Sequence, residues 1–190
     1  MRRYVIIAGV NGAGKTTLYK THPALFNMPR VNIDEIVRSF GSWKNKSDVF
    51  QAGMIAVHKI REYIATGSSF NQETTLCGRS ILQAIRTTRE KSYQIELFYV
   101  GIESADLALQ RINERVQRGG HGVPEEDVRR RYSESLKNLH IVIPMCDIVQ
   151  IYDNTEDMRQ LAEYRNGKQK WQLDRVPVWY AEWLSDVNHF

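Results

Sequence analysis

The sequence predicts an α/β fold in which helices cover both faces of a parallel β-sheet. Apolar runs of strand length alternate with longer helical patterns along the chain, which is typical of βαβ units. A glycine-rich loop follows the first apolar run and leads into a helical pattern. With 190 residues, 42% of them hydrophobic and 25% charged, residues 1–190 have the size and composition of a single globular domain.

Five strands and five helices can be placed in chain order. The first strand, Tyr4–Ala8, is a continuous apolar run, which suits a strand buried on both faces. The helix over about 47–66 repeats apolar residues at spacings of three and four and ends before Gly67. The other expected strands are 30–33, 69–72, 94–100 and 147–152, and the other expected helices are 14–20, 79–91, 105–118 and 125–139.

The region of about 104–140 is expected to form a helical hairpin rich in arginine. Helical spacing puts three of these arginines in a stripe beside the apolar face of the first helix, and Arg131 flanks that of the second. Such a hairpin suits a lid over a triphosphate. The stripe consists of Arg111, Arg115 and Arg118. The alternative is an exposed helix pair in which arginines form contacts with glutamates, and this alternative is favoured for Arg129 and Arg130.

Between these two helices, His121 is flanked by glycines at the tip of the hairpin. It could contact phosphate or substrate, although an ordinary turn histidine is favoured. The aromatic extension at about 165–190 is expected as a separate element whose side chains anchor it to the core, rather than a substrate wall or a partner surface. Its aromatic residues are Trp171, Trp179, Tyr180 and Trp183.

Composition excludes several classes of protein. Two cysteines, Cys77 and Cys146, cannot form the disulfide framework of a small secreted protein. The longest apolar run is far shorter than the roughly 20 residues of a membrane span, so no membrane association and a cytoplasmic location are expected. A net charge of +4 suits anionic ligands. A nucleic-acid surface is not favoured, because only Tyr132 interleaves with the clustered arginines.

The strongest motif is a phosphate-binding loop at residues 9–16, which matches G-x-x-x-x-G-K-[ST] without a mismatch. Its glycines let successive backbone N–H groups converge on phosphate oxygens. Lys15 supplies a charge for the β- and γ-phosphates, and the Thr16 hydroxyl can bind Mg²⁺. The expected nucleotide-binding residues are Asn11, Gly12, Ala13, Gly14, Lys15, Thr16 and Thr17.

The segment Asn45-Lys46-Ser47-Asp48 imitates the guanine motif of a GTPase. However, no aspartate in the chain is followed three residues later by glycine, so the corresponding switch element is missing. The segment is therefore expected to be a helix entry in which Ser47 or Asp48 serves as the cap.

Two carboxylates follow predicted strands, and ligands of such sheets bind at the carboxyl ends of the strands. Asp34 follows 30–33 and Glu73 follows 69–72. Phosphoryl transfer to a hydroxyl needs a carboxylate that orients or deprotonates it, and a further acidic group near Mg²⁺. The alternatives are a helix cap for Asp34 and a solvated loop acid for Glu73. Residues 152–154 could border the nucleotide base or form an ordinary turn.

Taken together and in order, these motifs resemble the zeta-toxin-like P-loop kinases. The resemblance is carried by A-G-V-N-G-A-G-K-T-T, N-I-D-E, F-N-Q-E-T-T-L, R-V-Q-R-G-G-H-G-V-P and R-R-R-Y, over about residues 4–155. It implies a three-layer fold around a five-stranded parallel sheet of order 2-3-1-4-5. It also implies MgATP-dependent phosphorylation of a hydroxyl of UDP-N-acetylglucosamine and restraint by a small antitoxin protein.

The resemblance also implies roles for individual residues. Asp34 matches the aspartate that activates the acceptor hydroxyl, and Glu73 matches the glutamate near Mg²⁺ and the sugar nucleotide. Arg131, with Arg118 or Arg115, matches the arginines that contact the γ-phosphate. We therefore expect an ATP- and Mg²⁺-dependent phosphotransferase with a small hydroxyl-bearing substrate. The alternatives are a regulatory ATP-binding module and a nucleic-acid or nucleoside kinase.

Overall fold

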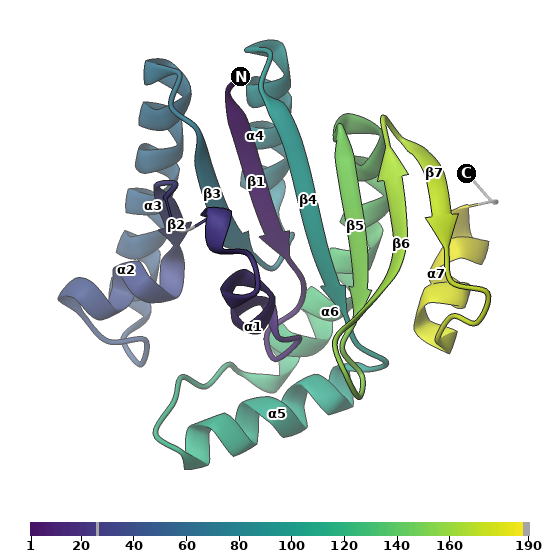
Figure 1. Cartoon of the computed structure of the whole chain (residues 1–190). Coiled ribbons are helices and arrows are strands. Elements are labelled where there is room, and N and C mark those ends of the chain that lie inside the picture. The colour runs from purple at the N-terminus through teal and green to yellow at the C-terminus, as the bar shows by residue number, and fades with distance from the viewer. Residues whose placement is uncertain (26, 188–190) are drawn as a thin grey trace.

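The computed structural model describes residues 1–25 and 27–187, and a seven-stranded sheet runs through the molecule (Figure 1). The strands are β1 (Arg3–Ala8), β2 (Arg30–Asn32), β3 (Phe70–Thr74), β4 (Gln94–Gly101), β5 (Ile148–Asp153), β6 (Arg159–Arg165) and β7 (Lys168–Gln172). The helices are α1 (Lys15–Lys20), α2 (Ile33–Phe40), α3 (Lys46–Thr66), α4 (Arg79–Glu90), α5 (Ala105–Gln117), α6 (Glu125–Val142) and α7 (Val178–Val187), with 3-10 turns η1 (Pro23–Leu25) and η2 (Ile143–Met145).

The sheet is mixed, and its strand order is β2-β3-β1-β4-β5-β6-β7. Strands β1 to β5 pair in parallel, whereas β6 and β7 add to the edge beyond β5 in antiparallel fashion. The prediction of a five-stranded, all-parallel sheet is therefore wrong. The α/β class itself is confirmed, with helices on both faces of a sheet whose first five strands in sequence run parallel.

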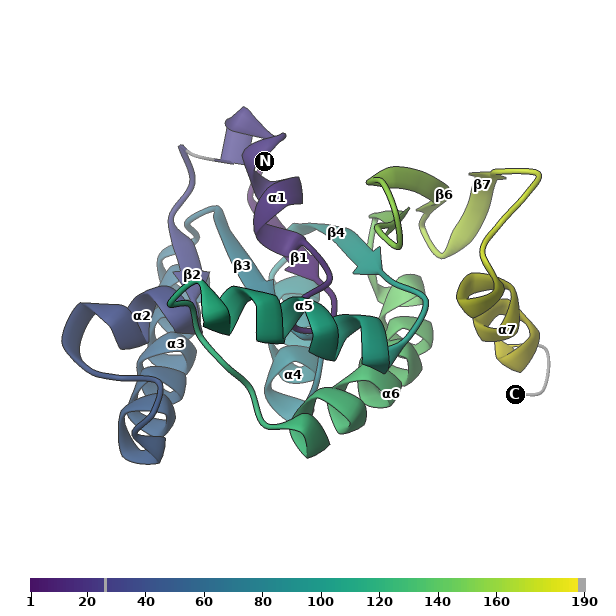
Figure 2. The ribbon, with the colours of Figure 1, turned by 90° about the horizontal axis from the view of Figure 1, so that it is seen from below.

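Strand β1 lies in the middle of the sheet and is buried on both faces, as its apolar run predicts. Tyr4, Ile6 and Ala8 face a core formed with α3, α4, α6 and α7. Val5 and Ile7 face a second core formed with α1 and α5. Figure 2 shows the same division, with α1 on one side of the sheet and α3, α4 and α6 on the other.

The carboxyl ends of the parallel strands meet at one edge of the sheet, and α5 crosses this edge. In Figure 1 the arrows of β1 and β4 point toward α5, and Figure 2 shows α5 lying across the sheet at this edge. Ser104 caps α5 by accepting a hydrogen bond from the Leu107 N–H at 3.1 Å, and Ala108 and Ile112 anchor the helix in the second core. The hairpin of α5 and α6 therefore stands next to the loop that follows β1.

The carboxyl-terminal region is not a separate element, contrary to expectation. Strands β6 and β7 continue the sheet, and Trp179, Tyr180 and Trp183 of α7 are buried in the first core. The prediction that these aromatic side chains anchor the tail is confirmed for these three, whereas Trp171 on β7 is 41% exposed. Among the helices described, none combines the length and the apolar character needed to cross a bilayer.

Candidate active site

The phosphate loop joins β1 to α1, and a residue that follows β5 holds it in place. Gly14 forms the N-cap of α1 in a left-handed conformation with φ 99°, which side chains rarely tolerate. A Cβ at this position would also lie 2.3 Å from the Asn154 Nδ2 atom. Asn154, which follows β5, donates from Nδ2 to the Ala13 carbonyl at 2.8 Å. The segment after β5 therefore braces the phosphate loop.

Lys15 lies at the centre of the loop with only 8% of its surface exposed. Its ammonium donates to the carbonyls of Gly9 at 2.8 Å and Val10 at 3.0 Å. Burial lowers the pKa of this amine, while the negative charges of Glu73 and Asp34 act in the opposite direction. The loop therefore holds a desolvated cation close to the two carboxylates that the sequence singled out.

Glu73 is the second-last residue of β3 and is largely buried, so it is not a solvated loop acid. Its side chain is 11% exposed and its Oε2 atom forms an ion pair with Arg30 at 2.5 Å. Asn32 donates to the same oxygen at 3.2 Å. The Thr16 hydroxyl lies 3.4 Å from Oε1. The Thr16 hydroxyl and the Glu73 carboxylate thus lie close together beside the phosphate loop.

Asp34 lies in the first turn of α2 and does not cap it. The cap is Asn32, whose side chain accepts a hydrogen bond from the Asp34 N–H at 2.9 Å. The Asp34 carboxylate is therefore left to face the neighbouring cavity with 41% of the side chain exposed. Within the described part of the chain, Asp34 lies beside the ring of His121, whose Nε2 atom is 4.0 Å from Asp34 Oδ1.

Two arginines of the hairpin reach the surroundings of the loop. Arg131 donates from Nη1 to the Asn11 side-chain oxygen at 3.1 Å. Arg115 donates from Nε to the His121 carbonyl at 2.9 Å, and its Nη2 atom is buried without a partner among the described residues. Its charge acts on Lys15 and lowers the pKa of that amine. Arg118 is exposed at the C-cap of α5, so the structure brings Arg115 rather than Arg118 into this group.

The remaining arginines of the hairpin have structural partners. Arg129 pairs with Asp106 at 2.7 Å and Glu125 at 2.8 Å, and Arg130 pairs with Asp127 and Glu134 at 2.7 and 3.0 Å. The expectation of Glu–Arg contacts for these two is confirmed. Arg111 donates to the carbonyls of residues 154 and 155 at 2.8 and 2.9 Å. It thereby holds the segment that braces the phosphate loop.

A cavity of about 850 Å³ is lined by Asn11, Lys15, Asp34, Glu73, His121 and Arg131, among others. It extends from the phosphate loop along the ends of β2 and β3 to the segment after α2, and His121 and Arg131 close one side. Sequence reasoning missed part of its wall, which the α2–α3 segment supplies with Trp43, Lys44 and Lys46. A tryptophan isolated in the polar stretch Gly41-Ser42-Trp43-Lys44 was the available signal. The segment that imitates a guanine motif is a helix entry, as expected. Its cap is Asn45, rather than Ser47 or Asp48, because the Asn45 side chain accepts a hydrogen bond from the Ser47 N–H at the start of α3.

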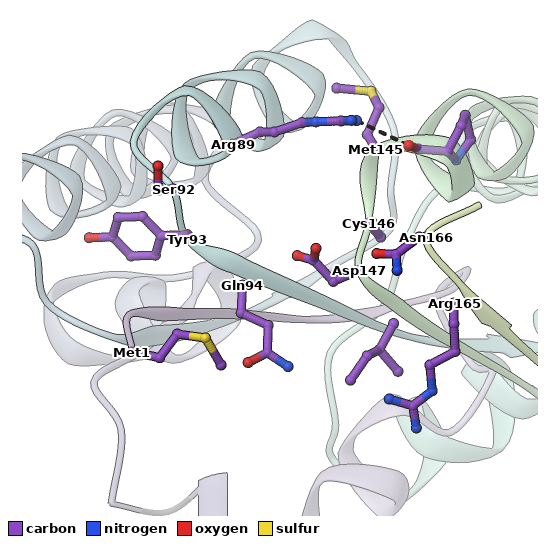
Figure 3. A pocket seen from close by; sticks show the side chains of 12 residues that line it. Met1, Arg89, Ser92, Tyr93, Gln94, Met145, Cys146, Asp147, Arg165 and Asn166 are labelled. Carbon is purple, nitrogen blue, oxygen red and sulfur yellow. Dashed lines mark hydrogen bonds between the residues drawn. The ribbon is translucent and has the colours of Figure 1, made fainter. Parts of the chain in front are cut away.

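A second cavity of about 590 Å³ lies at the opposite end of β4 and β5 (Figure 3). Two of its charged groups are engaged with neighbouring backbone: Arg89 donates to the Pro144 carbonyl at 3.0 Å, and Asp147 accepts from the Ile95 N–H at 2.7 Å. It lies at the amino ends of the parallel strands, away from the phosphate loop. We therefore place the candidate active site in the larger cavity.

Comparison with known proteins shows the family of the chain. The zeta toxin family model matches residues 2–166 of the chain. A curated protein of Haemophilus influenzae, described as uncharacterized, is 33% identical over 132 residues, which are 67% of this chain and 91% of that protein. The family match spans every candidate residue from the phosphate loop to Asn154.

Solved structures share the fold at low sequence identity. A crystal structure of AvrRxo1-ORF1 with AvrRxo1-ORF2 and ATP has a TM-score of 0.68 at 15% identity and covers 98% of this chain. Our chain spans 63% of the length of that chain. The PezAT chromosomal toxin–antitoxin system of Streptococcus pneumoniae gives a TM-score of 0.62 at 13% identity, covering 100% of this chain and 85% of that one. The chain belongs to the zeta toxin family, whose members are P-loop kinase-like phosphotransferases.

Proposed function

We infer that the protein transfers the γ-phosphate of ATP to a hydroxyl group of a small metabolite. The observation that carries this proposal is the convergence of Lys15, Asp34, Glu73 and Arg131 on one cavity. A cation for the donor phosphates, a carboxylate for the acceptor hydroxyl and a guanidinium for the transferring group are the parts that phosphoryl transfer requires.

The residues beside the loop also fit a magnesium ion. Thr16 and Glu73 offer a hydroxyl and a carboxylate oxygen, which are the ligand types that Mg²⁺ prefers. Within 1–25 and 27–187 there is no group of three or more His, Cys, Asp and Glu that could hold a metal ion. Thr16 and Glu73 would thus hold the ion together with phosphate oxygens and water, as is usual for Mg²⁺ at nucleotide sites. When bound, Mg²⁺ offsets the charge of the donor phosphates.

The chemical step can be assigned to the residues present. The acceptor oxygen bonds to the γ-phosphorus as the bond from this phosphorus to the bridging oxygen breaks, and ADP leaves with the electron pair. The Asp34 carboxylate takes the hydroxyl proton. Lys15 and Arg131 stabilise the charge on the phosphoryl oxygens, and Arg115 adds a buried guanidinium nitrogen that lacks a protein partner in the described chain.

The wall of the cavity suits an acceptor that carries negative charge and a flat group. Lys44 and Lys46 supply positive charge, and Trp43 supplies an aromatic ring. A volume of about 850 Å³ lies within the range of about 300–1,000 Å³ found for small-molecule sites. UDP-N-acetylglucosamine, which the family resemblance implies, has these properties and is the first acceptor to test. We also propose a cytoplasmic location and a small antitoxin partner.

The proposal is tested by incubating the protein with MgATP labelled at the γ-phosphate and a panel of sugar nucleotides, nucleosides and oligonucleotides. We expect the label on a small hydroxyl-bearing metabolite. Label released only as free phosphate, or bound ATP without turnover, would instead indicate a regulatory ATP-binding module. Label on oligonucleotide ends, with steep salt dependence of binding, would indicate a nucleic-acid kinase.

Two variants separate donor binding from transfer. Lys15→Ala is expected to abolish transfer and to weaken ATP binding measured by calorimetry, because the loop loses its cation. Asp34→Ala is expected to leave ATP binding unchanged and to lower kcat by about 10²–10⁴, the usual contribution of a general base. Unchanged turnover in Asp34→Ala would remove that residue from the chemical step.

A further inference from the structure

His121 occupies a position that other elements build for it. Its carbonyl accepts the hydrogen bond from Arg115 Nε at 2.9 Å, which ties the turn to α5. Its imidazole packs edge-to-face on the Trp43 ring, with ring centroids 4.7 Å apart and an interplanar angle of 84°. The histidine therefore bridges the α5–α6 hairpin and the α2–α3 segment across the mouth of the candidate active site.

The glycines on either side of His121 permit this close packing. A Cβ at Gly120 would lie 2.5 Å from the Arg115 Cγ atom and 2.9 Å from the Arg115 carbonyl oxygen. A Cβ at Gly122 would lie 3.2 Å from the Val116 Cγ2 atom and 3.5 Å, an ordinary contact distance, from the edge of the Trp43 ring. Arg115 therefore packs tightly against the turn at Gly120, and the Val116 and Trp43 side chains border the turn at Gly122.

The imidazole is directed at the carboxylate that takes the proton in the proposed reaction. His121 Nε2 lies 4.0 Å from Asp34 Oδ1, beyond hydrogen-bond length but within reach of a small side-chain rotation. We propose that His121 is a positioning residue: its Nε2–H donates to Asp34 Oδ1 and orients the other carboxylate oxygen toward the acceptor hydroxyl. This proposal rests on the proposed function, because it assigns the carboxylate its role.

The charges around His121 favour the neutral imidazole that this role needs. Asp34 and Arg38 face it from α2, Arg115 from α5 and Arg131 from α6. Burial, together with the three guanidinium groups, lowers the pKa of the imidazole below its ordinary 6.5, and Asp34 opposes this shift. At pH 7 the neutral ring donates one hydrogen bond without adding charge. Protonation at lower pH would place a cation beside Asp34 and make that carboxylate a weaker base.

Kinetics of three histidine variants test the role. His121→Ala is expected to lower kcat for the accepted substrate by about 10- to 100-fold, the cost of a misplaced catalytic group, with the dissociation constant of ATP unchanged. His121→Gln keeps an amide N–H donor and is expected to recover most of kcat. His58→Gln, at an exposed position of α3, is the matched control and should behave as wild type. Equal losses in His121→Ala and His121→Gln, or no loss in either, would overturn the proposal.

The pH profile distinguishes positioning from a structural role. In wild type, kcat is expected to fall on the acid side as the imidazole becomes protonated. In His121→Gln this limb should be absent from the pH range in which the imidazole is protonated, because the variant has no imidazole to protonate. An acid limb at the same pH in both proteins would show that His121 does not act through Asp34.

An NMR titration of the His121 imidazole separates this proposal from the proposed function. The pKa of His121 is expected to fall in Asp34→Asn relative to wild type, because the variant loses the negative charge that raises it. This readout needs no turnover. If the pKa falls and wild type phosphorylates no acceptor, the proposed function has failed and the positioning role fails with it. If transfer occurs and the pKa is unchanged in Asp34→Asn, only the positioning role is overturned.

Discussion

At the scale of single residues, Arg115 and Arg118 lie about one helical turn apart and have different surroundings. Both lie at the end of α5 and both belong to the same predicted stripe. Arg115 packs under the hairpin turn and keeps one buried guanidinium nitrogen without a partner in the described chain. Arg118 is exposed at the C-cap. Helical spacing cannot separate them, because the difference arises from where the turn after α5 folds back.

We therefore expect Arg115→Ala to lower kcat by about 10²–10³, the usual cost of removing one preorganised donor from a charged transition state. Arg118→Ala, the matched control on the same helix end, should retain kcat within about twofold. Steady-state transfer from labelled ATP to the accepted substrate measures both variants. The reverse order, with Arg118→Ala as the damaging change, would assign the γ-phosphate contact to Arg118.

Also at this scale, sequence reasoning located the phosphate loop, Asp34 and Glu73 because each follows a recognisable strand. It could not assign the cap of α2, since Asn32 and Asp34 are both good capping residues and only the backbone decides which one begins the helix. Sequence reasoning did not identify Trp43 as a site residue, because no nearby apolar pattern indicates what an aromatic residue in a polar segment packs against. Its partner, His121, is far away along the chain.

At the scale of elements, the hairpin of β6 and β7 is the main feature that the sequence analysis missed. Its turn is Asn166-Gly167, with φ 50° and 75°, and an Asn-Gly pair between two strand-length segments is a strong hairpin signal. The edge strand β7 is mostly polar, with Lys168 and Lys170 exposed. Because hydrophobic periodicity is weak in an exposed edge strand, the Asn-Gly turn was the sequence signal that could have predicted this hairpin.

The contact between α7 and the end of β5 also belongs to this scale. Asp153 is 2% exposed and accepts hydrogen bonds from Trp179 Nε1 at 3.0 Å and from Thr155 Oγ1 at 2.6 Å. The following residue is Asn154, which braces the phosphate loop. Helix α7 therefore supports the loop indirectly, through the carboxylate at the end of β5.

Trp179→Phe keeps an aromatic ring and removes the N–H donor to Asp153. We expect it to lower the free energy of unfolding by about 1.5–3 kcal/mol, the range for a lost hydrogen bond to a charged group. Trp171→Phe, on the exposed edge strand, should change stability by no more than about 0.5 kcal/mol. Chemical denaturation of both variants compares them directly. Equal effects would mean that the tryptophan N–H does not stabilise this carboxylate.

At the scale of the whole molecule, the site draws on segments that are distant in sequence and adjacent in space. Residues of the phosphate loop, the starts of α2 and α3, the end of β3 and the α5–α6 hairpin line one cavity. The sequence predicted the strand ends of this set, since parallel strands end at a common edge. It could not predict that the α2–α3 segment forms part of the cavity wall, because the path of a loop depends on tertiary packing.

The pH dependence of folding is also a property of the whole molecule, and Cys146 dominates one part of it. This thiol is 2% exposed between η2 and β5, and burial, with a smaller effect of Asp147, raises its pKa to about 12. In the unfolded chain a cysteine has a pKa of about 8.5. Because the folded value is the higher one, the resulting stability is fully present below about pH 8.5 and is lost as the pH rises toward 12.

Wild type should therefore lose about 1.4 kcal/mol of unfolding free energy between pH 7 and pH 9.5 through this group alone. Cys146→Ala should lack this loss while carrying a constant penalty for the smaller side chain. Denaturant titrations with a reductant at several pH values provide the comparison, and stopping at pH 9.5 limits the contribution of the buried tyrosines, whose pKa values are also raised. Parallel stability curves for the two proteins would show that Cys146 ionises as readily in the folded chain as in the unfolded one.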